Sequence, residues 1–426
     1  MRIAVVGLGH IGLPLAVQYA SRGHEVIGCD TAQWIVDAIN RGESPHADEQ
    51  TLIDRVPELV AAGRLRATTD DAEGVRQAEA VVVIVPVVVD AQRQIDFRPI
   101  DAATRDIASG LQPSTLVVYE TTLPVGTTRD RFGPMLEQGS GLTLDRDFFL
   151  AFSPERVLVG RVFLDLRRYP KIVGGTSDES TRRAVEFYRS VLDEGTEVQQ
   201  VTSAETAEMT KLAETTYRDL NIAYANELAR YASRRGIDVL EVIGAANSQP
   251  YSHIHQPGVG VGGHCIPVYP HFLFNDAPEL RLAPIAREIN EEMAGWTVDR
   301  IEEAVGSLVG QPVLVLGIAY RGDVREDAFS SAFRLRDELL AAGAKVYASD
   351  PYFDDDHLRQ LGFEPYDPAS DGQVKVAVLQ AAHGTYQDLD PASLPGLELF
   401  VDGRNALDPA GFAAAGVAYL GIGHPG

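Results

Sequence analysis

Three glycines near the start of the chain have the spacing of a dinucleotide-binding turn. They lie in Gly7-Leu-Gly-His-Ile-Gly12, which directly follows a β-branched run and opens a helical pattern. Such glycines permit a tight turn, a close approach of backbone to a pyrophosphate and close helix–strand packing, while the helix N-terminus supplies a positive dipole. Asp30 lies 18 residues after Gly12, at the end of the next predicted strand. A carboxylate there accepts from a ribose 2′-hydroxyl and repels a 2′-phosphate, so the pattern favours NAD over NADP and leaves FAD as an alternative.

A second chemical signal is Cys265, which lies in the glycine-rich stretch Gly258-Val-Gly-Val-Gly-Gly-His-Cys-Ile-Pro. The glycines would let a substrate approach the backbone, and neighbouring N–H groups could hold an oxyanion. A thiol here could attack an aldehyde, and a second hydride transfer would convert the thiohemiacetal into a thioester. The other cysteine, Cys29, precedes Asp30 on a predicted strand and is interpreted as a small core residue. Two cysteines are no disulfide framework, so a reducing cytoplasm is the expected compartment.

Lys211 lies in the first third of a long predicted helix, with acidic residues on neighbouring turns. A solvated lysine paired with an acid one turn away is the ordinary interpretation of that pattern. Four histidines also fall close together, but their spacing with Cys265 repeats no zinc pattern, so no metal is predicted. They are His253, His255, His264 and His271.

These residues need a scaffold in which strands and helices alternate. Strand-like runs occur at 1–6, 25–29, 80–85, 115–119, 148–152 and 171–174, with helical stretches between several of them. This alternation predicts a parallel doubly wound sheet with helices on both faces. The first domain is expected to span residues 1–198.

A long helix is expected next, because no glycine or proline interrupts residues 203–235. At about 1.5 Å per residue it would be about 50 Å long, a length that usually joins domains or builds a dimer interface. A second strand–turn–helix unit begins at residue 312 and reaches Asp350 without a glycine triplet. The predicted fold is therefore α/β, with two Rossmann-like doubly wound parallel sheets joined by a helical middle domain at 199–309 and a C-terminal domain at 310–426.

Composition limits the partners. The 426 residues include 37 Lys+Arg and 61 Asp+Glu, a net charge of −24. A surface that negative repels phosphate backbones and anionic lipid, so neither nucleic acid nor membrane is an expected partner. No apolar run reaches the roughly 18 residues of a membrane span. Any anionic ligand must then be held by local dipoles and a few well-placed cations. The chain as a whole contains only four lysines against 33 arginines.

Six motifs of this chain, in the same order, resemble those of the UDP-glucose/GDP-mannose dehydrogenase family. They are GLGHIGLP at 7–14, ETTLPVGTT at 120–128, FSPERV at 152–157, AEMTKLAETTYRDLNIAYANELA at 207–229, GVGGHCIP at 260–267 and DGRN at 402–405. The similarity runs from residue 1 to about residue 405. Within the family, the chain is most similar to the branch that oxidises UDP-N-acetylmannosamine and related UDP-N-acetylhexosamines.

The resemblance implies an NAD-binding Rossmann domain, a helical middle with a dimer-forming helix, and a C-terminal domain that grips UDP. The implied reaction is a four-electron oxidation of the C6 alcohol of a UDP-hexose or UDP-N-acetylhexosamine to the carboxylate, with two NAD⁺ reduced. The resemblance also implies a cytoplasmic homodimer, built through the long central helix, that serves polysaccharide biosynthesis.

By motif, Cys265 is similar to the family's nucleophile, Lys211 to the group that manages the alcohol proton or the oxyanion, and Glu155 to the residue that acts through water in thioester hydrolysis. Thr122 would lie beside the nicotinamide and that water, and Thr215 would belong to the catalytic set. The implied cofactor contacts are Gly7, Gly9, His10, Ile11, Gly12, Asp30, Val87, Thr122 and, toward a neighbouring subunit's NAD, Arg325. The implied substrate contacts are Arg156, Val157, Lys211, Thr215, Arg218, Tyr251, Gly262, Arg321 and Arg404. Arginine forks suit a diphosphate on an acidic protein.

Three places depart from the family's pattern. Thr215 replaces an asparagine that helps to hold the oxyanion, Tyr269 replaces an aspartate four residues after the cysteine, and residues 249–251 are Gln-Pro-Tyr where the branch often has His-Pro-Arg. Two alternatives therefore stay open: an enzyme that stops at the aldehyde or epimerises the sugar, and a non-catalytic nucleotide-sugar sensor. A two-domain hydroxyacid dehydrogenase would explain the segment 7–30, but not the second α/β unit or the cysteine loop.

Overall fold

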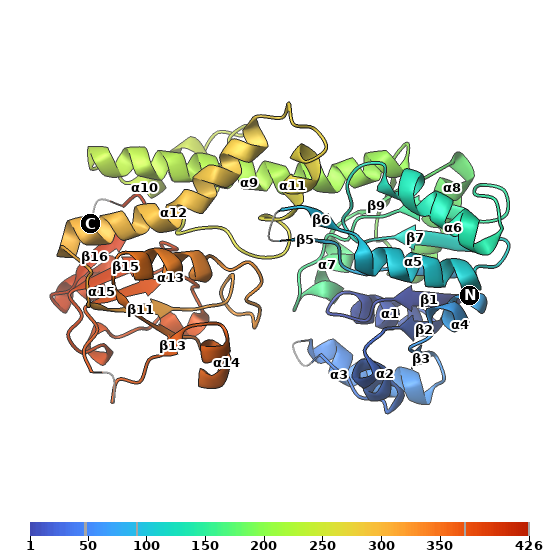
Figure 1. Ribbon diagram of the computed structural model, residues 1–426, viewed down its shortest axis with the longest axis horizontal. Coiled ribbons are helices and arrows are strands. Elements are labelled where there is room, and N and C mark those ends of the chain that lie inside the picture. Colours follow the sequence, from blue (N-terminus) through green and yellow to red (C-terminus); the bar gives the residue numbers. More distant parts are fainter. Residues whose placement is uncertain (47–48, 91–92, 370–371, 425–426) are drawn as a thin grey trace. The chain divides into compact units, whose positions relative to one another are not determined.

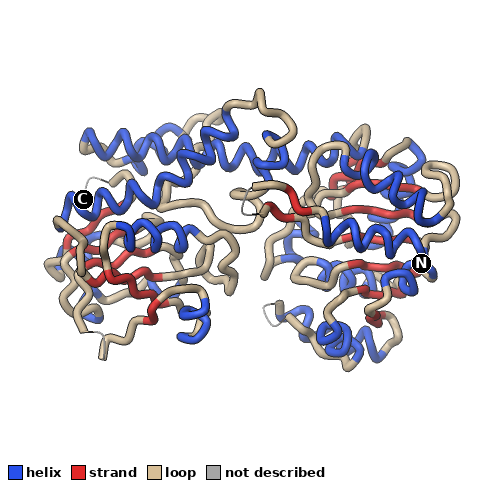
Figure 2. Tube along the Cα trace, viewed as in Figure 1, coloured by secondary structure: helices blue, strands red, loops and turns tan. Residues whose placement is uncertain are grey.

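The computed structural model describes residues 1–46, 49–90, 93–369 and 372–424 (Figure 1). The chain divides into two compact units, Met1–Glu214 with His271–Asp276, and Thr215–Pro270 with Ala277–Gly426. In each unit, strands form a sheet that is flanked by helices (Figure 2). The predicted α/β class with two doubly wound sheets is confirmed. The domain limits at 198 and 309 stay predictions.

The first unit is built on an eight-stranded sheet with the order β10-β9-β8-β7-β4-β1-β2-β3. Its central strands are apolar and almost fully buried, as expected for a parallel sheet covered on both faces. The strands are β1 (Arg2–Val6), β2 (Glu25–Cys29), β3 (Leu65–Thr68), β4 (Ala80–Val83), β7 (Leu116–Tyr119), β8 (Phe149–Phe152), β9 (Lys171–Gly175) and β10 (Val198–Gln200). A separate antiparallel pair, β5 (Val88–Val89) and β6 (Ile95–Asp96), follows β4.

Helices of this unit pack on the sheet, and α1 is buried on all sides from Gly12 to Ala20 while others bury one apolar face. In α8 (Asp178–Val191), for example, Ala184, Val185, Phe187, Tyr188 and Val191 are buried, and Ser177 caps the first turn. The others are α1 (Gly12–Ser21), α2 (Gln33–Asn40), α3 (Gln50–Ala61), α4 (Asp71–Arg76), α5 (Arg98–Gly110), the π-helical turn η1 (Thr127–Phe132), α6 (Gly133–Ser140) and α7 (Val162–Arg168).

Two strands of the first sheet, β9 and β10, run opposite to the expected parallel direction. β9 pairs antiparallel with β8, with Phe152 opposite Gly174, and β10 runs parallel to β9. The connection from β8 to β9 contains only α7, about 10 Å long at 1.5 Å per residue, and the chain stays near the edge where β8 ends. The chain therefore re-enters the sheet at that edge, and β9 begins beside the carboxyl end of β8.

The second unit contains a six-stranded parallel sheet with the order β13-β12-β11-β14-β15-β16. Its strands are β11 (Pro312–Leu316), β12 (Lys345–Ser349), β13 (Glu364–Pro365), β14 (Val376–Leu379), β15 (Leu399–Asp402) and β16 (Ala418–Gly421). Its helices include α13 (Ser331–Ala341), α14 (Asp355–Gln360), α15 (Pro409–Ala414) and the 3₁₀ turns η2 (Gly384–Tyr386) and η3 (Pro391–Ser393).

Between the two sheets the chain is mostly helical. The predicted long helix is confirmed as α9 (Ala204–Arg235), which is continuous for 32 residues. α10 (Val239–Ala246), α11 (Tyr269–Phe274) and α12 (Leu282–Val305) follow it. Within the described ranges, no helix is both long enough and apolar enough to cross a membrane.

Candidate active site

The turn after β1 has the geometry that a dinucleotide needs. Gly7 has a φ of +93°, which residues with a side chain rarely adopt. A Cβ on Gly12 would lie 1.8 Å from the Gly7 carbonyl oxygen, whereas a Cβ on Gly9 would meet no atom within 4 Å. Gly9 and His10 are exposed and Ile11 is half-buried. α1 has no acidic residue in its first turn, so no local carboxylate neutralises its N-terminal dipole.

Asp30 follows β2 and holds this turn in place. Its Oδ2 accepts from the backbone N–H of Leu8 at 2.8 Å, and its Oδ1 accepts from the N–H of Ala32 at 2.8 Å. The carboxylate is half-buried beside the glycine turn, where the ribose of a dinucleotide would lie. Asp350 has the same place after β12, but its side chain is fully buried against His383. The glycine turn of the first unit therefore fits a dinucleotide, and the second sheet lacks an accessible counterpart of Asp30.

Two further loops meet the glycine turn at the carboxyl edge of the first sheet. A Cβ on Gly7 would lie 2.8 Å from a carbonyl oxygen of the loop after β4. In the loop after β7, Thr121 Oγ1 donates to the Val85 carbonyl at 2.8 Å. Val87 and Thr122, which follow in these two loops, are buried. The structure thus places both residues at the same edge as the other predicted cofactor contacts.

Glu155 follows β8 at this edge and is held through its main chain and its side chain. Lys211, on α9, is buried and donates from Nζ to the Glu155 carbonyl at 2.8 Å. It is therefore not the solvated lysine that its helical neighbours alone suggest. Lys171 Nζ lies 2.7 Å from Glu155 Oε2, and the backbone N–H of Arg156 donates to Oε1 at 2.7 Å. Two of the four lysines in the chain converge on this residue.

Lys171 also contacts Glu120, which is fully buried behind Glu155. Lys171 Nζ lies 2.6 Å from Glu120 Oε2, while the hydroxyls of Tyr188 and Tyr19 donate to Oε1 at 2.6 and 3.3 Å. Burial raises the pKa of Glu120. Burial alone would also raise the pKa of Glu155, but the charge of Lys171, aided by hydrogen bonds, holds that pKa below its usual range. The sequence analysis assigned no role to Glu120 or Lys171, although Glu120 begins the motif at 120–128.

Cys265 belongs to the second unit and is half-buried. The two glycines before the His-Cys pair admit no side chain: a Cβ on either Gly262 or Gly263 would lie 2.9 Å from Tyr320. Gly263 also has a φ of +94°. The loop backbone therefore packs closely on the loop after β11. The Cys265 carbonyl accepts from the N–H of Tyr269 at 2.9 Å, so the cysteine starts the turn that leads into α11.

A chain of buried polar side chains holds the start of this loop. The N–H of Gly258 donates to Asn226 Oδ1 at 3.0 Å, and Asn226 Nδ2 donates to Asn290 Oδ1 at 2.8 Å. Asn290 in turn donates to Asp219 Oδ1 at 2.7 Å, and Arg287 Nε donates to Asp219 Oδ2 at 2.6 Å. These contacts were not predicted, and their one signal in the sequence is that Asp219 and Asn226 both lie in the motif at 207–229.

Arg404 lies where the loop after β15 meets the glycine loop. Its Nη1 donates to the Gly260 carbonyl at 2.9 Å, its Nη2 to Ser331 Oγ at 3.0 Å and its Nε to the Gln380 carbonyl at 2.5 Å. Among the described residues it forms no salt bridge, and burial lowers its pKa to about 10. A half-buried guanidinium that contacts neutral acceptors only is suited to bind an anion.

The other predicted substrate and cofactor contacts are more exposed. Arg321 is half-buried, and its Nε donates to the hydroxyl of Tyr320 at 3.0 Å. Arg156 Nε contacts Glu214 Oε2 at 2.9 Å. Val157 is half-buried, Thr215 is buried one turn after Lys211, and the exposed residues are Arg218, Tyr251 and Arg325.

The structure thus assembles the predicted residues in two sets, one in each unit. The first set is Gly7, Gly9, His10, Ile11, Gly12, Asp30, Val87, Thr122, Glu155, Arg156, Val157 and Lys211. The second set is Thr215, Arg218, Tyr251, Gly262, Cys265, Arg321, Arg325 and Arg404.

Comparison with known families agrees with this division of the predicted residues between the two units. Residues 1–192 match the NAD-binding domain of the UDP-glucose/GDP-mannose dehydrogenase family, residues 205–292 its central domain and residues 314–409 its UDP-binding domain. The chain belongs to the UDP-glucose/GDP-mannose dehydrogenase family. As a member of this family it is an NAD-dependent UDP-sugar dehydrogenase, and NAD is the dinucleotide that its glycine turn fits.

Members of the family with similar sequences are UDP-N-acetyl-D-mannosamine dehydrogenases. The one from Pyrococcus horikoshii is 34% identical over 427 residues, which cover 98% of this chain and 99% of that protein. The one from Escherichia coli K12 is 38% identical over 354 residues, 80% of this chain and 82% of that protein. The solved structure of UDP-D-ManNAc dehydrogenase from Pyrococcus horikoshii has a TM-score of 0.90 at 32% identity and covers both chains completely.

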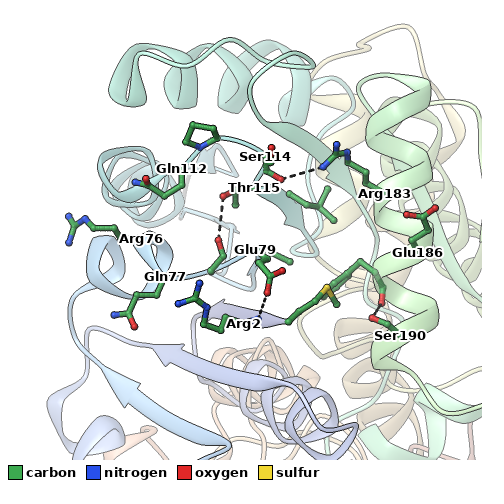
Figure 3. A pocket seen from close by; sticks show the side chains of 16 residues that line it. Arg2, Arg76, Gln77, Glu79, Gln112, Ser114, Thr115, Arg183, Glu186 and Ser190 are labelled. Atoms are coloured by element: carbon green, nitrogen blue, oxygen red, sulfur yellow. Dashed lines mark hydrogen bonds between the residues drawn. The ribbon is translucent and has the colours of Figure 1, made fainter.

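A cavity of about 570 Å³ lies at the opposite edge of the NAD-binding sheet of this family member, where β1, β4 and β7 begin (Figure 3). Arg2, Arg76 and Arg183 line it together with the acidic Glu79 and Glu186, and Arg183 is paired with Glu179. Ligands of open α/β sheets bind beyond the carboxyl ends of the strands. The cofactor site is therefore assigned to the glycine turn and not to this cavity.

Proposed function

We propose that the protein oxidises the C6 alcohol of a UDP-N-acetylhexosamine to the carboxylate, through a thioester on Cys265 and with two NAD⁺ reduced per sugar. The observation that carries the proposal is the half-buried guanidinium of Arg404, which contacts neutral acceptors only and lies against the glycine loop that leads to Cys265. A diphosphate would supply the anionic partner that is missing from the contacts of this guanidinium. The glycine loop therefore combines an arginine that suits a diphosphate with the thiol of Cys265.

The first unit supplies the cofactor side. Gly7, Gly9 and Gly12, with the N-terminus of α1, would hold the pyrophosphate, and Asp30 would accept from a ribose hydroxyl. NAD⁺, when bound, supplies the acceptor for the hydride that leaves C6 in each of the two oxidations. Thr122 is buried at the same edge and would line the nicotinamide side of the site.

Lys211 would manage the proton and the oxyanion at C6. Its ammonium carries three donors, and one of them is anchored at the Glu155 carbonyl. The alcohol proton would pass to solvent water as hydride leaves C6, and the anchored ammonium would stabilise the negative charge that develops on the oxygen. The same charge would stabilise the oxyanion of the later thiohemiacetal.

Cys265 would capture the aldehyde that the first oxidation produces. The thiolate sulfur bonds to C6, and the former carbonyl oxygen takes up a proton, which gives a thiohemiacetal. Loss of a second hydride from C6 and of the hydroxyl proton converts it into a thioester. The proposal requires that the thiol of the second unit and the lysine of the first unit reach the same carbon.

Glu155 would activate the water that releases the product. The water oxygen bonds to the acyl carbon, one water proton passes to the Glu155 carboxylate, and the C–S bond breaks. Cys265 is thereby restored and the uronic acid is released. A carboxylate that is ionised at neutral pH is needed for this step, and Glu155 is such a group because Lys171 lies beside it.

UDP-N-acetylmannosamine is the sugar nucleotide that we propose first, because the similar sequences carry names of dehydrogenases for it. The segment 249–251 differs from the pattern of that branch, and Tyr251 is 91% exposed. A UDP-N-acetylhexosamine with another configuration or a UDP-hexose is the next substrate to test. The uronic acid product would serve polysaccharide biosynthesis in the cytoplasm.

We also propose that the protein is a homodimer that pairs through α9. Tyr217, Tyr224 and Tyr231 are spaced by seven residues, which places them on one face of the helix, and each is at least 51% exposed. A row of exposed aromatic side chains marks an interaction surface. Sedimentation of Tyr224→Glu should show a monomer where the unchanged protein shows a dimer, and a dimer that survives this change would exclude the α9 face.

The decisive experiment for the function is a panel of UDP-sugars incubated with NAD⁺, followed by mass spectrometry of the products. We expect the acid of UDP-N-acetylmannosamine from the unchanged protein and none from Cys265→Ala. Cys29→Ala is the matched control, because Cys29 is fully buried in the core and should be dispensable for acid formation. Full acid production by Cys265→Ala would rule out the thioester route.

An enzyme that stops at the aldehyde is the second candidate, favoured by Thr215 and Tyr269 at positions where the family pattern has an asparagine and an aspartate. A hydroxyl is shorter than an amide and offers one donor instead of two. This candidate predicts one NADH per sugar and an aldehyde that hydrazine traps. The same panel separates the two candidates.

A further inference from the structure

The reversed direction of β9 determines which side chain lies beside Glu155. Phe152 of β8 is opposite Gly174 of β9, and continuing this register by three pairs places position 171 opposite position 155. A β9 parallel to β8 would start at the other edge of the sheet, away from the glycine turn. The reversal therefore delivers Lys171, the first residue of β9, to the carboxyl edge where Glu155 lies.

Lys171 bridges two carboxylates in a nearly dry setting. Its Nζ lies 2.7 Å from Glu155 and 2.6 Å from Glu120, and the exposed fractions of the three side chains are 5%, 12% and 0%. The Nζ also lies 4.9 Å from the centre of the Tyr188 ring. Charge pairs are strong where water is excluded, so the ammonium position is fixed by both acids.

The other groups around Glu155 do not supply this charge. Tyr19 of α1 and Tyr188 of α8 donate to Glu120. Arg156 offers Glu155 only its backbone N–H, since its guanidinium contacts the carboxylate of Glu214 on α9, and Lys211 reaches the Glu155 carbonyl instead of the carboxylate. Within the part of the chain that the structure describes, Lys171 is thus the one cation paired with the Glu155 carboxylate.

We propose that Lys171, itself held by Glu120, is a positioning residue that keeps Glu155 ionised and oriented for the attack of water on the Cys265 thioester. A buried carboxylate without a counter-charge takes up a proton, and a protonated carboxyl cannot accept one from water. Lys171 acts through Glu155 and touches no reacting atom. The inference rests on the proposed function, because it needs the thioester, but it assigns a residue that the family motifs do not contain.

The test is Lys171→Met, compared with Lys345→Met, an exposed lysine of β12 in the second unit. In Lys171→Met both oxidations should proceed and hydrolysis should stall. We expect a burst approaching two NADH per active site, a thioester adduct on Cys265 in the intact-protein mass after acid quench, and steady turnover at pH 7 lowered at least about tenfold, since a general base contributes about a hundredfold or more. Lys345→Met should turn over without a burst or an adduct.

The pH profile separates loss of charge from general damage. Removal of Lys171 raises the pKa of Glu155, so the acidic limb of turnover should move to higher pH, and Lys171→Met should recover activity as the pH rises. Lys171→Arg keeps the cation and should keep the limb near its original position. Glu120→Gln keeps Lys171 beside Glu155, so its limb should stay at lower pH than that of Lys171→Met.

Two results would overturn the inference while the thioester route stands: adduct-free turnover of Lys171→Met with an unchanged profile, or a Lys171→Arg limb that moves upward as far as that of Lys171→Met. If Lys171→Met does not fold, as circular dichroism would show, Lys171→Gln and the Lys171→Arg profile decide between the same outcomes. Acid production by Cys265→Ala would instead remove the proposed function itself, and then no variant should carry an adduct.

Discussion

At the scale of single residues, Arg404 is a cation of the second unit whose guanidinium contacts neutral acceptors only. A guanidinium has five N–H groups, and three of them bond to the Gly260 and Gln380 carbonyls and to Ser331. Burial lowers its pKa to about 10, so the charge of Asp402 offsets the desolvation of the cation only in part. Its remaining donors suit an anion, which makes Arg404 the residue whose loss should weaken UDP binding most clearly.

Replacement of Arg404 by Met should raise the dissociation constant of UDP about ten- to a hundredfold. The reason is that hydrogen bonds to charged groups contribute about 1.5–3 kcal/mol, and each 1.4 kcal/mol is a factor of ten. Arg404→Lys keeps the charge without the planar fork, so its dissociation constant for UDP should lie between those of the unchanged protein and Arg404→Met. Isothermal titration of UDP measures the effect, with the exposed Arg359→Met as control; equal affinities for Arg404→Met and the control would contradict the assignment.

Sequence alone identified the residues that carry distinctive chemistry, but not those that hold them. Cys265 was recognisable from its glycine loop, and Cys29 as a core residue, which its full burial confirms. Lys211 pointed to a surface position until the motif was considered, because its contact with the Glu155 carbonyl depends on packing between distant segments. Lys171 could not be assigned, since its pairing requires the direction of β9, which no local pattern encodes.

At the scale of elements, Glu208 fastens the long helix α9 to the loop that contains Thr122. Its carboxylate accepts from the N–H of Gly126 at 2.6 Å, and from the N–H and hydroxyl of Thr128 at 2.9 and 2.6 Å. Burial raises the pKa of Glu208 to about 7, although these hydrogen bonds oppose the rise. The carboxyl that joins the two elements is thus half-protonated near neutral pH.

The raised pKa of Glu208 makes the free energy of unfolding depend on pH. The folded protein binds the proton of Glu208 more tightly than the unfolded chain, so the stability that Glu208 provides is present below the ordinary pKa of about 4.5 and is lost as pH rises through about 7. The loss is of the order of 3 kcal/mol at most.

Glu208→Gln should remove this pH dependence. The advantage in melting temperature of the unchanged protein over the variant should be smaller at pH 8 than at pH 5. The exposed Glu194→Gln is the control and should show a constant difference. A gap between the unchanged protein and Glu208→Gln that widens toward pH 8 would contradict the account.

The elements that sequence predicted well have clear local boundaries. The strand at 25–29 lies between a charged start and Asp30, and α9 has no glycine or proline in its 32 residues. The strands that were not predicted, such as β13 and β16, have two and four residues and depend on neighbours for their pairing. Their positions follow from tertiary packing, not from propensity.

At the scale of the whole molecule, a net charge of −24 sets the electrostatic background. Like charges on one surface repel each other and destabilise the compact state. Local groups such as Arg404 and the α1 N-terminus must then bind anionic ligands against the overall field.

Screening this repulsion should stabilise the protein without its ligands. Raising NaCl from about 0.01 M to 0.15 M shortens the screening length from about 30 Å to about 8 Å. We expect the melting temperature to rise by a few degrees over that range. Differential scanning calorimetry measures it, and a melting temperature that falls with salt would show that attractive ion pairs outweigh the repulsion.

The central claim is that one active site carries a sugar alcohol to the acid by two successive oxidations on a cysteine. Its most direct test is to count NADH formed per UDP-N-acetylmannosamine consumed, with excess NAD⁺ and mass analysis of the product. The account predicts two NADH and one uronic acid for each sugar. One NADH for each sugar, with an aldehyde as the product, would contradict it.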